Sequence, residues 1–110
     1  MASKHTTARG ETLSGIAQDY YGDASLYPMI ALVNKIANPD IIRVGQVLII
    51  PDIGGDAPRH RVIRGDTLSK LARRYYGDAT LYDLIAIANS ISNPDFIDVG
   101  EVLIIPDITT

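Results

Sequence analysis

The chain has 110 residues, with 10 Lys and Arg against 13 Asp and Glu, a formal net charge of -3 and no cysteine or tryptophan. The lack of cysteine excludes disulfides and thiolate metal sites, and the acidic balance argues against a nucleic-acid partner. No apolar run approaches the roughly 20 residues of a membrane span, so we expect no membrane insertion. Residues 1–7 lack the apolar core of a signal peptide. We therefore expect a protein made in the cytoplasm without an export signal.

The first half of the sequence begins with a predicted strand over residues 5–8 and continues into an amphipathic helix. Thr12 is the expected N-cap of this helix, and Gly22 is its expected left-handed stop. The helix itself is predicted from apolar residues that recur at i, i+3, i+4, i+7 and i+8, namely Leu13, Ile16, Ala17, Tyr20 and Tyr21.

A second helix, a turn and a closing strand complete the first half. We expect Ser25 to cap the helix, Pro28 to lie in its first turn and Asn34 to mark its end. The sequence Asn-Pro-Asp at residues 38–40 predicts a turn, and the β-rich run at residues 47–50 predicts a strand.

The second half repeats the first without gaps at an offset of 55 residues, and about 32 of the 55 aligned pairs are identical. Chance cannot produce such agreement, so each half is one structural unit. We assign unit 1 to residues 1–53, a linker to residues 54–58 and unit 2 to residues 59–110. The predicted elements of unit 2 are strands at residues 60–63 and 102–105, a first helix bracketed by Thr67 and Gly77, and a second helix from Thr80, with Asp83 as the acid of a capping box, to Asn89.

The motifs of each half resemble the LysM domain. Gly-(Glu/Asp)-Thr-Leu-Ser precedes the first helix, and Asn-Pro-Asp is followed by Gly-(Gln/Glu)-x-Leu-x-Ile-Pro. The segment Tyr-Tyr-Gly-Asp-Ala-(Ser/Thr)-Leu-Tyr resembles an insertion in a bacterial and phage subgroup, which includes proteins of phage tails and contractile injection particles and a cytoplasmic potassium-binding protein. The resemblance implies an α+β fold of two βααβ units. Each unit would have a two-stranded antiparallel sheet with both helices on one face.

The resemblance also implies non-catalytic binding of N-acetylglucosamine-containing glycans such as peptidoglycan or chitin, in a groove between the turn before the first helix and the turn after the second. A purely structural use of the same residues, as helix caps and turns, is the alternative. No Ser, His and acid recur as a triad would require, so we expect no enzyme, no metal and no cofactor. The matching positions are Gly10, Glu11, Thr12, Leu13, Asn38, Pro39, Asp40 and Ile41 in unit 1, and Gly65, Asp66, Thr67, Leu68, Asn93, Pro94, Asp95 and Phe96 in unit 2.

The strands depart from the pattern of the family on the face away from the helices. A sheet covered on one side should alternate apolar and polar residues, but this face is apolar in both units. We therefore expect it to be buried, by the back of the sister unit's sheet, by another protein or by a second copy of the chain. The residues concerned are Val47, Ile49, Ile63, Val102 and Ile104.

Three functions follow from the sequence. The first is a bivalent glycan-binding protein, which a phage or injection particle would carry to the cell wall. The alternative is a structural adaptor that binds other proteins of a phage tail or injection-system baseplate without binding glycan. The third, which only the resemblance to the subgroup implies, is a cytoplasmic potassium or cation-binding protein. Turn carbonyls together with Asp40 or Asp95 are the candidate ligands for a cation.

Overall fold

The computed structural model describes all 110 residues, which fold as two compact units. The first consists of Met1–Asp52 together with Ile108–Thr110, and the second of Ile53–Asp107. The C-terminal residues 108–110, which the sequence assigned to unit 2, thus belong with unit 1. Within unit 1 the Ala2 N–H donates to the Thr109 carbonyl over 2.7 Å, which joins the two ends of the chain.

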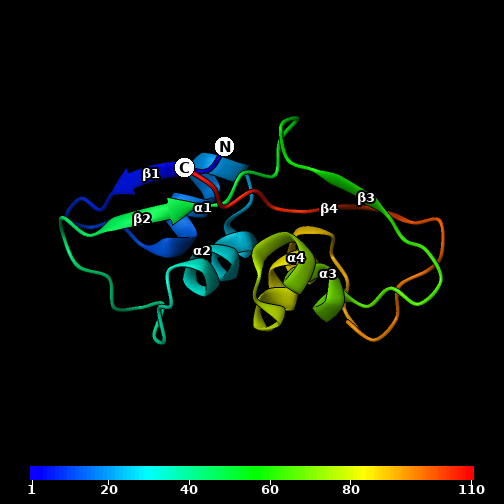
Figure 1. Cartoon of the computed structure of the whole chain (residues 1–110). Helices are drawn as coiled ribbons and strands as arrows, with labels where there is room; N and C mark the ends of the chain where they lie inside the picture. Colours follow the sequence, from blue (N-terminus) through cyan, green and yellow to red (C-terminus); the bar gives the residue numbers. More distant parts are fainter. The chain divides into compact units, whose positions relative to one another are not determined.

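Unit 1 is a two-stranded antiparallel sheet with two α-helices. The strands pair from Ser3 opposite Ile50 to Thr6 opposite Val47, and both helices lie on one face of the sheet (Figure 1). In chain order the elements are β1 (Ser3–Thr6), α1 (Leu13–Tyr21), the 3-10 helix η1 (Ala24–Leu26), α2 (Tyr27–Val33) and β2 (Val47–Ile50).

Unit 2 repeats this arrangement, with Arg59 opposite Ile104 and Arg61 opposite Val102 in its sheet. The predicted α+β class with two βααβ units is therefore confirmed. None of the helices is both long and apolar enough to cross a membrane. The elements are β3 (Arg59–Arg61), α3 (Leu68–Tyr76), the 3-10 helix η2 (Ala79–Leu81), α4 (Tyr82–Ala88) and β4 (Val102–Ile104).

The first helix of each unit begins and ends where the sequence predicts. The Thr12 hydroxyl accepts the Gly15 N–H over 3.1 Å, and Gly22 closes α1 with a φ of 70°. Thr67 and Gly77 do the same for α3. The helical spacing then places the buried side chains on the face that meets the sheet, where Leu13, Ile16 and Ala17 pack with Leu48 and Ile50.

The start of the second helix differs from the prediction. Asp23, and not Ser25, is the cap: its carboxylate accepts the Ser25 N–H over 2.9 Å and opens a 3-10 turn, after which α2 begins at Tyr27. Asp78 repeats this role before Thr80. Asp83 therefore lies in the first turn of α4, where its negative charge interacts favourably with the positive end of the helix dipole. It forms no capping box with Thr80.

The first strand of each unit begins earlier than predicted, at Ser3 rather than at residue 5 and at Arg59 rather than at residue 60. Each ends where the chain must turn into the next helix. In unit 1 the Thr7 N–H still bonds to the Gln46 carbonyl over 2.8 Å, so pairing continues just beyond the strand.

Each sheet is also held to its second helix by one asparagine side chain. The Asn34 amide donates to the carbonyls of Ile30 and Ile49 and accepts the Ile49 N–H, each over 2.8 Å. Asn89 makes the same three bonds to Ile85 and Ile104. These contacts fix the end of α2 or α4 against the middle of a strand and so set the spacing between the turns that flank the candidate site.

Candidate functional site

A groove lies in each unit between the turn before the first helix and the loop after the second. In unit 1 it encloses about 300 Å³, and in unit 2 about 340 Å³. The residues lining it are Glu11, Thr12, Leu13, Ser14, Tyr27, Pro39, Asp40 and Ile42 in unit 1, and Asp66, Thr67, Leu68, Ser69, Tyr82, Pro94, Asp95 and Ile97 in unit 2. At every aligned position except Glu11 and Asp66 the two linings are identical.

One wall of the groove is the turn into the first helix. Gly10 has a φ of 86° and Gly65 a φ of 89°, a left-handed backbone that glycine adopts without steric cost. The resemblance to the family placed both glycines at the glycan groove. Neither lines the groove, so their role is to form the turn.

The opposite wall is the Asn-Pro-Asp turn. The Asn38 side-chain oxygen accepts the Asp40 N–H over 3.0 Å, and its carbonyl accepts the Ile41 N–H over 3.0 Å. Asn93 repeats both bonds with Asp95 and Phe96. The turn thus uses its own backbone donors internally and presents Pro39 and the Asp40 side chain to the groove.

The structure brings five of the eight predicted residues of each unit together in the groove. In unit 1 they are Glu11, Thr12, Leu13, Pro39 and Asp40. Asn38 and Ile41 instead line a second, shallower hollow of about 470 Å³, together with Lys35 and Arg43. Ile41 and its counterpart Phe96 are largely exposed.

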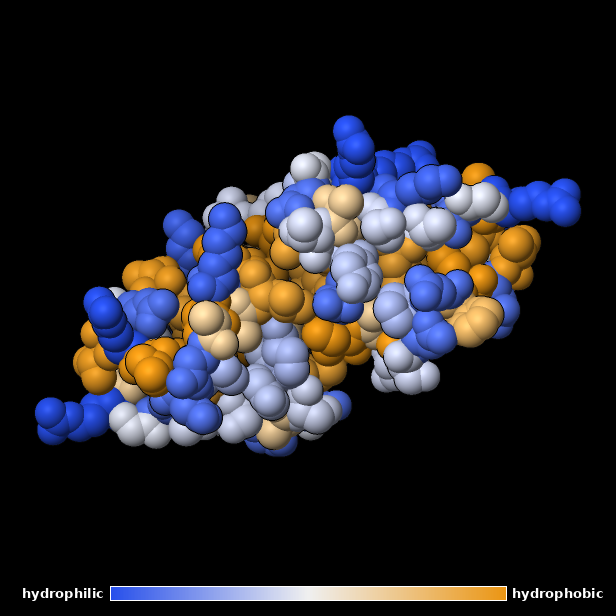
Figure 2. Space-filling model, turned by 90° about the horizontal axis from the view of Figure 1, so that it is seen from below, coloured by the Kyte–Doolittle hydropathy of each residue, from blue (hydrophilic) through white to orange (hydrophobic).

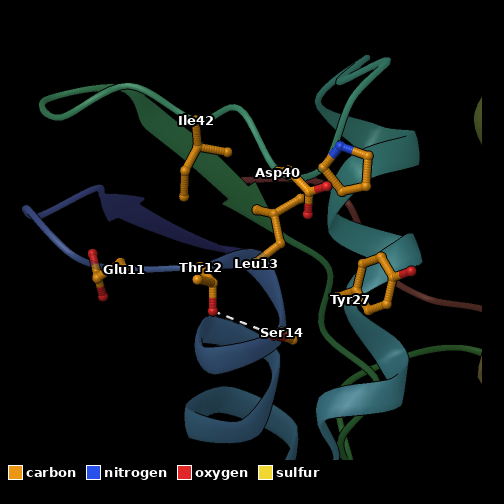
Figure 3. A pocket seen from close by; sticks show the side chains of 8 residues that line it. Glu11, Thr12, Leu13, Ser14, Tyr27, Asp40 and Ile42 are labelled. Atoms are coloured by element: carbon orange, nitrogen blue, oxygen red, sulfur yellow. Dashed lines mark hydrogen bonds between the residues drawn. The ribbon is translucent and has the colours of Figure 1, made fainter.

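Sequence reasoning missed three lining residues in each unit: Ser14, Tyr27 and Ile42, and their counterparts Ser69, Tyr82 and Ile97. The signal for the tyrosine is its place as the last residue of the Tyr-Tyr-Gly-Asp-Ala-x-Leu-Tyr segment, which is repeated in both units. In the groove Tyr27 faces Leu13 across the space between α2 and α1 (Figure 3).

The carboxylate of Glu11, at the end of the groove near the first strand, is held by hydrogen bonds. Glu11 accepts the Ala8 N–H over 2.6 Å and pairs with the His5 Nε2 at 2.9 Å, while the His5 Nδ1 lies 3.1 Å from the Tyr20 hydroxyl. The Ala8 N–H, and after it His5, hold the pKa of Glu11 below its usual value. Neither partner of His5 can be inferred from local sequence, because the two residues lie 6 and 15 positions away.

Unit 2 builds the same cluster with a shorter acid. Asp66 accepts the Ile63 N–H over 2.9 Å and pairs with the His60 Nε2 at 2.8 Å, and the His60 Nδ1 lies 3.0 Å from the Tyr75 hydroxyl. The Ile63 N–H and then His60 lower the pKa of Asp66. In both units the histidine thus links the acid at the start of the first helix to a tyrosine on that helix.

The carboxylate at the opposite wall is different. Asp40 has no hydrogen bond or ion pair to its side chain, and the same holds for Asp95. The backbone N–H groups of Leu13 and Ser14, in the first turn of α1, also have no partner in the chain. Each groove therefore offers free donors on one wall, a free acceptor on the other and apolar surface between them.

The apolar residues on the outer face of the sheets differ in their exposure within the single chain. Val47, Ile63 and Val102 are each more than half exposed, and Ile49 and Ile104 are partly buried. That another protein or a second copy of the chain covers this face stays a prediction. Other large apolar side chains also reach the surface, among them Val44 and Val99, and Figure 2 shows apolar and polar residues intermixed on the face that it draws.

No group of three or more His, Asp or Glu side chains comes together as the ligands of a metal ion would. Within each groove the two acidic side chains lie on opposite walls, and apolar residues lie between them.

Known proteins match both units. The family model of the LysM domain matches residues 5–51 and 60–106. The chain is 52% identical over 109 residues to Esterase Rv1288 of Mycobacterium tuberculosis. This match covers 99% of the chain and 23% of that protein. It is 32% identical over 124 residues to the secreted LysM effector ECP6 of Passalora fulva, covering 94% of this chain and 52% of that protein.

The chain is also 32% identical over 100 residues to the endolysin of Bacillus phage PZA, covering 91% of this chain and 36% of that protein. It therefore spans only a part of each of these relatives, and the esterase match leaves most of that protein outside it. The chain belongs to the LysM family and carries two of its domains, which are binding modules for N-acetylglucosamine-containing glycans.

Proposed function

We propose that this chain binds one N-acetylglucosamine-containing polymer through both of its grooves, without catalysis. The observation that carries the proposal is the duplicated groove, whose lining differs at a single aligned position between the units. Two sites with the same lining select the same ligand. A repetitive glycan is such a ligand, because it offers the same sugar at many positions.

The chemistry of the groove suits an acetamido sugar. The free N–H groups of Leu13 and Ser14 can donate to an acetamido carbonyl or a hydroxyl, while Tyr27 and Ile42 offer apolar contact to a methyl group or a sugar face. A shallow groove of this size binds weakly alone. Two grooves that engage one polymer raise the overall affinity by about 10² to 10⁴ when the geometry allows both to bind.

The proposal is tested by calorimetric titration with a chitin oligosaccharide. Ser14→Phe with Ser69→Phe places bulk inside both grooves and should abolish binding. The matched control, Gln18→Phe with Arg73→Phe, places the same bulk on exposed positions of the same helices outside the grooves and should bind normally. Equal binding by both double variants, or no binding by the native chain, would contradict the proposal.

A second candidate is a structural role in a phage tail or injection-system baseplate, carried by the exposed apolar residues Val47, Ile63 and Val102 on the sheets. The relative from Bacillus phage PZA fits a phage setting for either role, since it is named as an endolysin. Retention on insoluble chitin, an uncharged N-acetylglucosamine polymer, separates the two roles. Glycan binding requires retention that Ser14→Phe with Ser69→Phe abolishes, whereas the adaptor role predicts no retention.

A further inference from the structure

Each groove carries two carboxylates and no cationic side chain. Glu11 and Asp40 line the first groove, Asp66 and Asp95 the second, and no Lys, Arg or His is among the lining residues of either. Both acidic positions of the groove are acidic in each unit, although charges at other positions differ. For example, Arg43 of unit 1 aligns with Asp98 of unit 2. The charge of the groove is thus the same in both units.

The two carboxylates of a groove have different surroundings. Glu11 accepts the Ala8 N–H and pairs with the His5 Nε2, so both of these groups engage its carboxylate. Asp40 has no such partner, and its side chain lies beside Leu13 on the wall near Tyr27, at the far end from Glu11 (Figure 3). Asp95 holds the matching position in unit 2.

An unpaired carboxylate in a binding groove accepts hydrogen bonds and donates none. A neutral sugar satisfies it with a hydroxyl or an acetamido N–H, and such charge-assisted bonds are stronger than bonds between neutral groups. A sugar with its own carboxylate brings a like charge instead. No cationic side chain lines the groove to compensate for that repulsion.

We infer that Asp40 and Asp95 are specificity-determining residues that select uncharged N-acetylglucosamine oligosaccharides and reject those with carboxylates on neighbouring sugars. This inference rests on the proposed function, because it names the class of glycan that the same grooves accept. The unpaired carboxylate on the Asn-Pro-Asp wall thus favours an uncharged ligand over a negatively charged one.

The test compares two glycans that contain N-acetylglucosamine. A chitin oligosaccharide is uncharged, and a hyaluronan oligosaccharide of equal length alternates N-acetylglucosamine with a carboxylate-bearing sugar. In calorimetric titrations of the native chain, chitin should bind at least about tenfold more tightly at low salt. Asp40→Asn with Asp95→Asn should reduce this ratio several-fold, because asparagine keeps the shape of the side chain and removes its charge. Added salt should narrow the ratio in the native chain and leave it unchanged in the variant.

The matched control is Asp19→Asn with Asp56→Asn, which removes two exposed carboxylates outside the grooves and should keep the native ratio. Thermal melting of both double variants establishes that they are folded. If chitin binds but the ratio in Asp40→Asn with Asp95→Asn equals the native one, the inference is overturned and the proposed function stands. Binding of hyaluronan as tight as that of chitin by the native chain overturns it equally. If neither glycan binds, the proposed function fails and the inference with it.

Discussion

The two units have nearly the same backbone but do not have equivalent interiors. Tyr21 donates to the Pro51 carbonyl and Tyr76 to the Pro106 carbonyl, each over 2.6 Å. Lys35 and Ser90 both adopt the left-handed backbone, with φ of 55° and 56°. At one buried position, however, unit 1 has Thr7 and unit 2 has Val62, although both are nearly inaccessible.

The residue at that buried position is expected to make the two units differ in stability. The Thr7 hydroxyl is buried without a hydrogen-bond partner, and Val62 replaces it with a methyl group of similar size. A second difference lies in the first helix, where unit 1 has Gly15 and unit 2 has Lys70. Both differences weaken unit 1, since an unpaired buried hydroxyl and a helical glycine each cost stability. The fold therefore depends on the contacts that the units share and tolerates losses at the positions where they differ.

The largest expected effect comes from a contact that the units share. Asn34→Ala removes three hydrogen bonds and leaves the Ile49 backbone groups unpaired, so the free energy of unfolding should fall by about 2–4 kcal/mol. Asn89→Ala should cost about as much, because its bonds have the same lengths to within 0.1 Å. Urea denaturation measures both, and exposed Gln18→Ala is the control. A loss under about 1 kcal/mol would show that the asparagine is not what holds helix to strand.

A smaller effect is expected at the position where the interiors differ. Thr7→Val removes the unpaired hydroxyl and should raise the free energy of unfolding by about 1–2 kcal/mol. Val62→Thr creates the same defect in unit 2 and should lower it by about 1–3 kcal/mol. The two variants in urea denaturation thus test one difference in opposite directions. A destabilised Thr7→Val would mean that water or a rearranged neighbour satisfies the hydroxyl.

The helical glycine should have a still smaller effect. Gly15→Ala is expected to raise the free energy of unfolding by about 0.5–1 kcal/mol, because alanine loses less conformational freedom on folding. The new Cβ would lie 3.1 Å from the Thr12 hydroxyl oxygen. Lys70 has the equivalent place beside Thr67 and keeps a 3.1 Å capping bond, so the neighbour can accommodate it. Lys70→Gly should give a loss of similar size, and a loss from Gly15→Ala would mean that the Thr12 cap is displaced.

Much of this structure could be predicted from local sequence. The helical spacing of Leu13, Ile16 and Ala17, with Thr12 before it and Gly22 after it, fixed the first helix, because caps act on residues three or four positions away. The start of α2 could not be placed in the same way. Asp23 and Ser25 are both good caps, and the choice depends on the 3-10 turn that Asp23 opens.

The long-range contacts were less predictable. Asn34 reads locally as the end of a helix, but its side chain bonds to Ile49, 15 residues away. Tyr27 and Ile42 enter the groove only because α2 and the following loop return to α1. Val47 belongs to an apolar run that predicts burial, but such a run does not specify the surface that would cover it, and in the single chain the side chain is exposed.

The smallest expected effect concerns pH, because the groups involved are accessible to solvent. Glu11 and Asp66 have folded-state pKa values below their ordinary ones, owing first to the Ala8 and Ile63 N–H groups and then to the histidines. Their stabilising contribution is therefore present above the unfolded pKa values, about 4.3 for Glu and 3.9 for Asp. It is lost as the pH falls through the lower folded values.

Glu11→Gln with Asp66→Asn should remove this contribution, so the variant should be less stable than the native chain at pH 7. The gap should shrink as the pH falls below about 4, where the native carboxylates take up protons. Urea denaturation of both proteins from pH 7 to about pH 3 measures the gap. Asp19→Asn, which removes an exposed carboxylate, is the control. A gap that stays constant over this range would mean that the side chains stabilise the turns by their shape and not by their charge. In that case Glu11 and Asp66 would share the geometry of their hydrogen bonds but would make no stabilising contribution through their charge.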